Sequence, residues 1–281
     1  MTGAAGFVGG AVVAAARSCG WTVHPLTRRE WDVTTGPLPD PPAVDAVVHC
    51  AAVVTDAAEP GPVWAANLHG TRHVAASFPA ARLVHVSTAS VYDPRRPTVL
   101  AREDAAPVAR YDTPYAASKA AAERLLAGRP DTVVLRPHAV YGPGDPTLLP
   151  RVLGGVRGRT LVVPGHAGVR HTLTGVDVLA DAALRACTAP PGVYNVGDAA
   201  PVALGDALAA LVAARGLDVR VRFLPVPAAL ALAALPAVRR RGLTRYAVGH
   251  LGLERTLDLT AARAGLGLDP PPTSFDGAAG W

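Results

Sequence analysis

The sequence predicts an α/β fold in which helices cover both faces of a parallel sheet. Short apolar, β-rich runs alternate with alanine-rich stretches of helical length, which is the pattern of repeated strand–helix units. A glycine-rich turn precedes the first helical stretch. Half of the 281 residues are apolar, so the chain can bury one large core, or one core and a smaller lobe. We therefore expect a Rossmann-like, doubly wound sheet with a smaller C-terminal substrate lobe.

Each expected element follows from its local pattern. Buried strands are predicted for "WTVHPL" (21–26), "VDAVVHCAA" (44–52), "ARLVHVSTASV" (81–91), "DTVVLRP" (131–137) and "GVYNVGD" (192–198). Helices are predicted for "AVVAAARSC" (11–19), "VWAANLHGTRHVAASF" (63–78), "PYAASKAAAERLLAG" (114–128) and "TGVDVLADAALRACTAP" (174–190). After Pro143 the sequence becomes rich in turn residues, which indicates a second unit. The dinucleotide-binding domain should comprise residues 1–142 plus 172–198, and the substrate lobe 143–171 plus 199–281, with helices at 203–215 and 227–240.

Composition excludes several classes of protein. The formal charge is +5, but the arginines are scattered, and the single run of three (239–241) is typical of a solvated helix end rather than a nucleic-acid site. Three cysteines without CxxC or metal-ligand spacing favour reduced thiols, no metal site and a cytoplasmic location. The apolar run 223–238 is too short and too proline-rich to cross a bilayer, so we expect no membrane span.

The amino-terminal "TGAAGFVGG" indicates a phosphate-binding turn. Its Gly3, Gly6 and Gly9 have a GxxGxxG spacing just before a helix. Glycine there lets the backbone approach a pyrophosphate, and the helix N-terminus supplies unpaired N–H groups. In a chain with 28 glycines this motif alone is not specific.

The stretch "YAASK" carries the stronger signal, since it holds the only lysine beside 26 arginines. Tyr115 and Lys119 lie four residues apart, so they share one face of a helix. A neighbouring ammonium stabilises a phenolate and should lower the pKa of Tyr115, so that this side chain can exchange a proton with a substrate hydroxyl. A compact ammonium can also reach ribose hydroxyls that a guanidinium would crowd. A chance coincidence of the two residues is the alternative.

Together these motifs resemble the extended short-chain dehydrogenase/reductase superfamily, which includes NAD-dependent epimerases and dehydratases and 3β-hydroxysteroid dehydrogenases. The matching pieces, in order, are "TGAAGFVGG", "WDVT", "VVHCAA", "NLHGT", "VHVSTASVYD", "YAASK", "LRPHAVYGPGD", "GVYNVGD" and "LDLTAARAGLGLDPPPT". The resemblance implies catalytic roles for Thr88, Tyr115 and Lys119, with Ser87 as the alternative to Thr88. It implies that Asn67 positions a helix. The implied cofactor-binding residues are Gly3, Gly6, Phe7, Val8, Gly9, Arg28, Asp32, Val33, Ala51, Ala52, Tyr115, Lys119, Pro137 and Val140.

The implied chemistry is hydride transfer between a substrate carbon and a nicotinamide, with NAD or NADP as the cofactor. An NAD-selective site usually has an acidic residue after its second strand, whereas this chain has Thr27 and Arg28 there. Arg28 could contact a 2′-phosphate or stack on adenine, so we favour NADP, with Arg29 expected in solvent.

Departures from the family pattern narrow the reaction. Dehydratases carry an acidic pair after the catalytic threonine, where this chain has Ala89 and Ser90. Nucleotide-sugar enzymes place an arginine where this chain has His171, with Arg170 one position away. The apolar segment 224–248 resembles the steroid dehydrogenase branch, where a helix covers a lipophilic substrate; ordinary packing is the alternative.

We therefore expect an enzyme that interconverts a secondary alcohol and a ketone on a small, moderately apolar substrate. The alternatives are a nucleotide-sugar 4-epimerase or 4-ketoreductase, and a non-catalytic nucleotide-binding protein. By resemblance we also expect a homodimer. The family's hydrophobic first strand is apparently missing, because only Met1 precedes the "TG". We expect that the natural chain starts earlier, or that another segment fills this place in the sheet.

Overall fold

The main sheet is parallel, with the strand order β1-β2-β4-β10, in a computed structural model that describes residues 1–55, 59–235 and 243–281. Its strands are β1 (Ala46–His49), β2 (Arg82–Val86), β4 (Thr132–Pro137) and β10 (Gly192–Val196). All six residues of β4 are buried, because this strand has a neighbour on each side and helices on both faces. These four strands fall within the runs predicted from the sequence.

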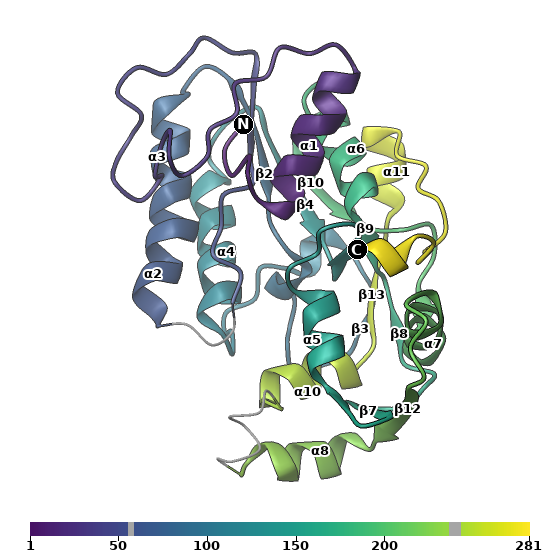
Figure 1. The fold of residues 1–281 in the computed structure, drawn as a ribbon. Helices are drawn as coiled ribbons and strands as arrows, with labels where there is room; N and C mark the ends of the chain where they lie inside the picture. The colour runs from purple at the N-terminus through teal and green to yellow at the C-terminus, as the bar shows by residue number, and fades with distance from the viewer. Residues whose placement is uncertain (56–58, 236–242) are drawn as a thin grey trace.

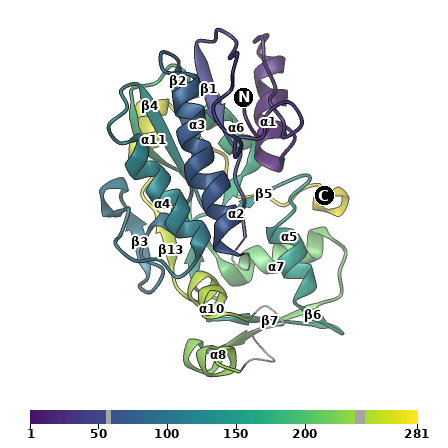
Figure 2. The ribbon, with the colours of Figure 1, turned by 90° about the vertical axis from the view of Figure 1, so that its left-hand side faces the viewer.

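Helices cover both faces of this sheet, as predicted (Figures 1 and 2). One layer holds α2 (Pro60–Trp64), a π-helical turn (Ala65–His69), α3 (Gly70–Ser77) and α4 (Pro114–Leu126). The other layer holds α1 (Phe7–Ser18), α6 (Val176–Arg185) and α11 (Thr260–Leu266), with α1 packed on α6. The fold is therefore the doubly wound, Rossmann-like arrangement.

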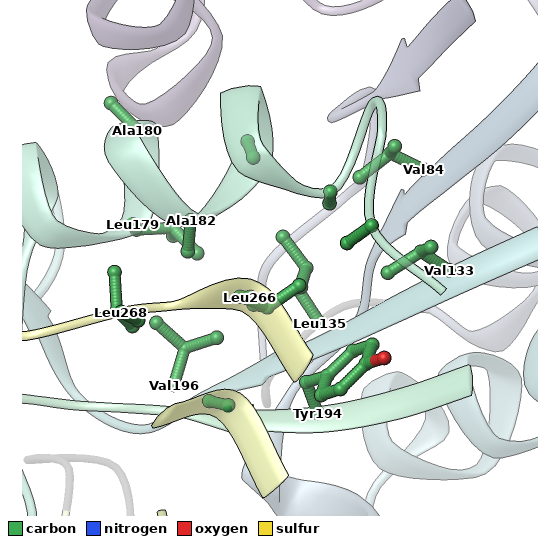
Figure 3. Close-up of a cluster of buried hydrophobic side chains, with 14 of the residues drawn as sticks. Val84, Val133, Leu135, Leu179, Ala180, Ala182, Tyr194, Val196, Leu266 and Leu268 are labelled. Atoms are coloured by element: carbon green, nitrogen blue, oxygen red, sulfur yellow. The ribbon is translucent and has the colours of Figure 1, made fainter. Parts of the chain in front are cut away.

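The largest apolar cluster lies between the sheet and the second helical layer (Figure 3). Val84, Val133 and Leu135 of the strands are fully buried, and they contact the α6 side of the molecule at Leu179 and Ala182. Small alanine side chains on α6 let the helix approach the sheet closely. Burial of apolar surface of this extent is the main stabilising term for the fold.

The place expected for the first strand is taken by a single residue. Thr2 forms parallel bridges with both Leu26 and His49, so it lies between the segment 21–26 and β1. Its amide donates to Val48 O at 3.1 Å, and its carbonyl accepts from Cys50 N at 3.2 Å. The strand predicted for 21–26 is wrong except at Leu26, where the backbone exchanges hydrogen bonds with Met1 and Ala4. An extended segment forms a strand only along a neighbour that satisfies its backbone groups.

The smaller lobe lies at one end of the main sheet in both views (Figures 1 and 2). A three-stranded sheet of β6 (Val156–Arg157), β7 (Thr160–Pro164) and β12 (Arg220–Leu224) packs with α7 (Leu204–Ala214). The lobe also holds α5 (Leu148–Gly154), α8 (Val226–Ala233) and α10 (Arg245–Gly252). The helix predicted for 227–240 ends at Ala233 in the structure, and the part from 236 onward lies outside the described residues. Throughout the described part of the chain, every helix is too short or too polar to cross a bilayer.

A second sheet connects distant parts of the sequence, with the order β11-β8-β13-β3. Its strands are β3 (Thr98–Ala101), β8 (Arg170–His171), β11 (Val202–Ala203) and β13 (Arg255–Leu257). A short parallel pair, β5 (Val140–Tyr141) and β9 (Thr174–Gly175), follows the end of β4. Short 3-10 turns cover Ala89–Val91, Glu103–Ala105 and Ala278–Gly280. The segments around the ends of β2 and β4 are thus tied to the C-terminal part of the chain.

A buried ion pair joins β4 to α4. Arg136 contacts Glu123 through two hydrogen bonds, of 2.7 Å and 3.1 Å, and the two side chains are 2% and 5% exposed. The remaining guanidinium hydrogens bond the carbonyls of Glu103 and Ala106 and the phenol of Tyr92. A charge pair is tolerated in such a dry place only when its hydrogen bonds are this complete.

We expect Glu123→Gln to lower the free energy of unfolding by about 3–5 kcal/mol, because it leaves the Arg136 charge buried without a counter-charge. Urea unfolding at pH 7 measures this loss. Asp181→Asn is the matched control, since Asp181 pairs with Arg185 on the exposed surface of α6 and should cost under about 1 kcal/mol. Equal, small losses for both variants would contradict the assigned role of the buried pair.

Candidate active site

The glycine turn before α1 has no room for side chains. Gly3 has a φ of +70°, and a Cβ there would come within 2.6 Å of Ala51 N. A Cβ on Gly9 would collide with the Gly3 carbonyl. Gly6 is the N-cap of α1 and provides no side-chain hydrogen bond, and the first turn has no acidic residue. This geometry fits a dinucleotide pyrophosphate, because the first N–H groups of a helix are free to bind an anion.

The predicted cofactor residues of the first turn, Phe7 and Val8, begin α1 directly after this cap. Ala51 lies against Gly3, and Ala52 follows it at the end of β1. The structure therefore brings the glycine turn and the loop after β1 together, as the sequence indicated.

The residues predicted for the adenosine end lie after the segment 21–26. The Arg28 guanidinium is 76% exposed and contacts the Asp32 carboxylate at 3.2 Å. Asp32 accepts hydrogen bonds from the amide and hydroxyl of Thr34, which lower its pKa. Val33 is buried against Gly70, where a larger residue than glycine would collide with it. Arg28 is thus a solvent-facing cation that can turn toward a ligand.

The hydroxyl of Thr88 lies close enough to the phenol of Tyr115 to act on the pKa of that phenol, and this pair is the centre of the candidate site. Thr88 Oγ1 accepts from the amide of Ser90 at 3.1 Å and donates to Ser90 Oγ at 3.2 Å, which fixes its orientation. Ser87 instead donates to the buried carboxylate of Glu123. The structure therefore directs Thr88, and not Ser87, toward the tyrosine. Ser87 is a hydrogen-bond partner of the buried Glu123–Arg136 ion pair.

The pKa of Tyr115 is raised to about 12, mainly by burial, against the effect of the Thr88 hydrogen bond. The lowered pKa expected from the sequence does not hold in this arrangement. Although Lys119 is one turn further along α4, its ammonium donates to Val86 O at 2.6 Å and contacts His85 Nε2 at 3.0 Å. Its charge is directed to the end of β2 and not to the phenol oxygen.

Lys119 is only 2% exposed, and burial lowers its pKa to about 8. The nearby Glu123 carboxylate acts in the opposite direction. Val86 O and the imidazole of His85 replace the water that an ammonium normally binds. The Lys119 ammonium is thus charged at neutral pH and loses its proton when the pH rises somewhat above neutral.

Sequence reasoning missed two buried histidines beneath this lysine. His85 and His49 are both fully buried, with ring centroids 5.3 Å apart. Burial, together with the Lys119 charge, lowers the pKa of each, so both imidazoles are neutral and can lie beside an ammonium. Histidines inside the apolar strand runs "VVHC" and "LVHV" were the available signal.

Asn67 has the positioning role that the sequence indicated. Its side-chain amide exchanges hydrogen bonds with the backbone of Val53 at 2.8 Å and 3.1 Å, and donates to Ser118 Oγ at 3.0 Å. It therefore connects the loop after β1 to helix α4, which carries Tyr115 and Lys119.

A cleft begins at Ala89, directly after Thr88. Its walls come from the turn after Thr88, the segment after β4, β13 and α10, and the lining residues are Ala89, Ser90, Tyr92, Pro94, Thr98, His138, Tyr246, His250, Arg255 and Leu257. Pro137 ends β4 and Val140 begins β5, on either side of His138. The predicted segment 137–140 therefore reaches the cleft.

Two predictions about the small lobe need correction or refinement. In the apolar segment 224–248, α10 and not α8 lines the cleft, and α8 packs on α10 through Ala229, Ala233 and Val248. His171 is buried and contacts Leu251 O at 3.2 Å, while the neighbouring Arg170 is exposed and bonds Pro201 O. Neither of these two residues lines the cleft.

The cysteines take no part in this site. Burial raises the pKa of Cys50 to about 12 and that of Cys187 to about 11, so both thiols are protonated, and Cys19 is exposed on the surface. Within the described ranges, no group of three or more histidine, cysteine, aspartate or glutamate side chains is arranged to hold a metal ion.

Residues 1–197 match the model of the NAD dependent epimerase/dehydratase family. The chain belongs to this family. It is similar to a 4-hydroxy-2-methyl-3-oxo-4-farnesyl-3,4-dihydroquinoline-1-oxide ketoreductase of Stigmatella aurantiaca, with 34% identity over 79% of this chain and 72% of that protein. A 2-alkyl-3-oxoalkanoate reductase of Stenotrophomonas maltophilia is 29% identical over 99% of this chain and 96% of its own.

A solved structure extends the family relationship to the whole fold. The UDP-glucose 4-epimerase of Thermus thermophilus in complex with NAD has a TM-score of 0.73 and 25% identity, covering 99% of this chain and 95% of that chain. Relatives in this family are NAD(P)-dependent reductases and epimerases of the extended short-chain type. The protein is accordingly an NAD(P)-dependent enzyme of the same type.

Titration of Lys119 should be visible in the stability of the protein. Because the pKa of Lys119 falls from 10.5 to about 8 on folding, the unfolded chain binds more protons between these values, and stability rises with pH there. Relative to Lys119→Met, the wild type should gain about 2 kcal/mol in free energy of unfolding between pH 7 and pH 10.

Urea unfolding of both proteins at the two pH values measures this gain. Groups that titrate in both proteins cancel from the comparison, and the chain has no second lysine. Arg124→Met, an exposed change on the same helix, should show no such pH dependence relative to wild type. A constant difference between wild type and Lys119→Met would mean that this ammonium is not desolvated.

Proposed function

We propose that the protein is an NAD(P)-dependent oxidoreductase that interconverts a secondary alcohol and a ketone on a small, moderately apolar molecule. The neighbouring hydroxyls of Thr88 and Tyr115, beside the turn that begins the wall of the cleft at Ala89, carry this proposal. The bound nicotinamide would supply or accept the hydride. Protein groups then need only orient the substrate and move one proton.

Each of the three side chains has a distinct part in that proton transfer. Thr88 donates a hydrogen bond to the reacting oxygen and holds it beside the phenol of Tyr115. With a pKa near 12, this phenol keeps its proton at neutral pH. It is therefore suited to protonate the alkoxide that forms when a ketone accepts hydride. The buried Lys119 ammonium is bonded to Val86 O and His85 rather than to the phenol, so its part would be to offer its remaining hydrogen to the cofactor ribose.

The relatives support a reductase, since the two proteins above are named for ketone reduction. The second candidate is a nucleotide-sugar 4-epimerase or 4-ketoreductase, which the likeness to the Thermus epimerase favours. Against it, the position that would hold the sugar-nucleotide diphosphate has the buried His171, whose Nε2 contacts a backbone carbonyl. A dehydratase is disfavoured because Ala89 and Ser90 provide no acid. A purely nucleotide-binding role would leave the Thr88–Tyr115 pair unexplained.

We expect Tyr115→Phe to lower ketone-reducing kcat by at least about 100-fold while NADPH affinity changes little, because the variant removes one hydroxyl of the proton path. Stopped-flow or spectrophotometric NADPH oxidation measures the rate, and fluorescence titration measures the affinity. Tyr111→Phe is the control, as the Tyr111 phenol donates to Val91 O outside the cleft.

Variants of the neighbouring residues sharpen this test. Thr88→Ala should lower kcat, whereas Ser87→Ala should mainly lower stability through Glu123. Lys119→Arg should impair both turnover and nucleotide binding, because the larger guanidinium cannot occupy the site between His85 and Val86 O. Full activity in Tyr115→Phe would remove the phenol from the mechanism.

We propose separately that Arg28 binds the 2′-phosphate of NADP and so gives the enzyme a preference for NADP over NAD. Arg28→Ala should weaken NADPH binding by about 10-fold and leave NADH binding nearly unchanged, because it removes one charge-assisted contact. Arg29→Ala, an exposed neighbour, is the control. Equal losses for both cofactors in Arg28→Ala would favour stacking on the adenine instead.

A further inference from the structure

His138, on the wall of the cleft, has one ring nitrogen without a partner. The side chain is 4% exposed, and its Nδ1 lies 2.7 Å from Thr172 O. A carbonyl oxygen only accepts, so Nδ1 carries the hydrogen and Nε2 of the neutral ring presents a lone pair. This Nε2 is buried and accepts no hydrogen bond from any residue that the structure describes.

Arg255 lines the same cleft and has the complementary unpaired atom. Its two terminal nitrogens donate to the carbonyls of residues 93, 94, 96 and 249 at 2.7–2.9 Å, which fixes the guanidinium in place. The remaining hydrogen, on Nε, is buried and has no acceptor within residues 1–55, 59–235 and 243–281. The wall therefore offers one acceptor and one donor, both shielded from water.

The groups around His138 keep its ring neutral. The ring of His171 is stacked on the ring of His138, with the ring centroids 5.7 Å apart. The ring of His250 is tilted against that of His138, with a centroid distance of 4.9 Å. Burial lowers the pKa of all three histidines, and that of His138 falls to about 4, assisted by the nearby Arg255 charge. Arg151 is a further cation close to His250. At neutral pH the ring of His138 is thus an acceptor at Nε2 and not a cation.

The chemistry of these two nitrogens selects a ligand group. A hydroxyl can donate to His138 Nε2 and accept from Arg255 Nε. A carboxylate cannot donate and would face the lone pair of Nε2, whereas an ammonium cannot accept and would meet the arginine charge. Buried unpaired groups discriminate strongly, because water cannot replace the missing partner.

We propose that His138 Nε2 and Arg255 Nε recognise a hydroxyl group of the substrate that is separate from the reacting oxygen, so that the preferred substrates are hydroxy ketones. This proposal rests on the function proposed above, in which Thr88 and Tyr115 hold the reacting oxygen. Ser90 connects the two places, since its amide bonds Thr88 Oγ1 and the residue lines the same cleft as His138 and Arg255. His138 is thus a specificity-determining residue.

Matched ketones test the proposal. The probes are 2-hydroxyacetophenone and 3-hydroxypropiophenone, each compared with the ketone that has a methyl group in place of the hydroxyl. We measure kcat/KM with NADPH, and separately the dissociation constants of the corresponding alcohols in the presence of NADP. The wild type should prefer at least one hydroxylated member by about 10-fold or more in both measurements.

Two substitutions of His138 separate recognition from folding. Asn can still donate to Thr172 O but has nothing at the position of Nε2, so His138→Asn should reduce the preference to less than about 3-fold. Gln reaches the position of Nε2 with a carbonyl acceptor, so His138→Gln should keep most of it. The control is His171→Gln, in a buried histidine outside the cleft, which should keep the wild-type preference.

The outcomes distinguish this inference from the proposed function. A binding preference that disappears in His138→Asn, without turnover of any ketone, would support the hydroxyl site and overturn the reductase proposal. Turnover without a hydroxyl preference, a preference retained in His138→Asn, or binding of neither alcohol would overturn the inference.

Discussion

The buried pair of Arg136 and Glu123 is the interaction on which the geometry of the site depends. It joins the central strand β4 to helix α4, which carries Tyr115 and Lys119. Glu123 also accepts a hydrogen bond from the hydroxyl of Ser87, which directly follows β2. A charge in a dry interior must be fully compensated, so the helix and both strands have little freedom to move relative to one another. Thr88 is the residue after Ser87, so this arrangement also fixes the position of Thr88.

The charges near the reaction centre are few and well separated. The Lys119 ammonium is surrounded by a backbone carbonyl and neutral imidazoles, and the phenol of Tyr115 is protonated at neutral pH. Burial is the first cause of both shifts, and it acts in opposite directions on an acid and a base.

The glycine turn and the cleft have different structural origins. The turn depends on backbone geometry, because Gly3 and Gly9 leave no space for a side chain where α1 meets the turn and the loop after β1. The cleft depends on side chains from elements far apart in the sequence, with His138 after β4, Arg255 on β13 and His250 on α10. Related enzymes of one fold can therefore share the turn and differ in the cleft.

The local pattern of the sequence determined the alternation of strands and helices, the glycine turn, and the placement of Tyr115 and Lys119 one turn apart on a helix. These features depend on neighbours only a few residues apart. It was wrong about the strand at 21–26, since a strand exists only when another segment pairs with it. It was also wrong about the pKa of Tyr115. Four-residue spacing places two side chains on one helix face, but the tertiary structure decides which distant groups they meet. Here the carbonyl of Val86 and the ring of His85, from another strand, receive the ammonium.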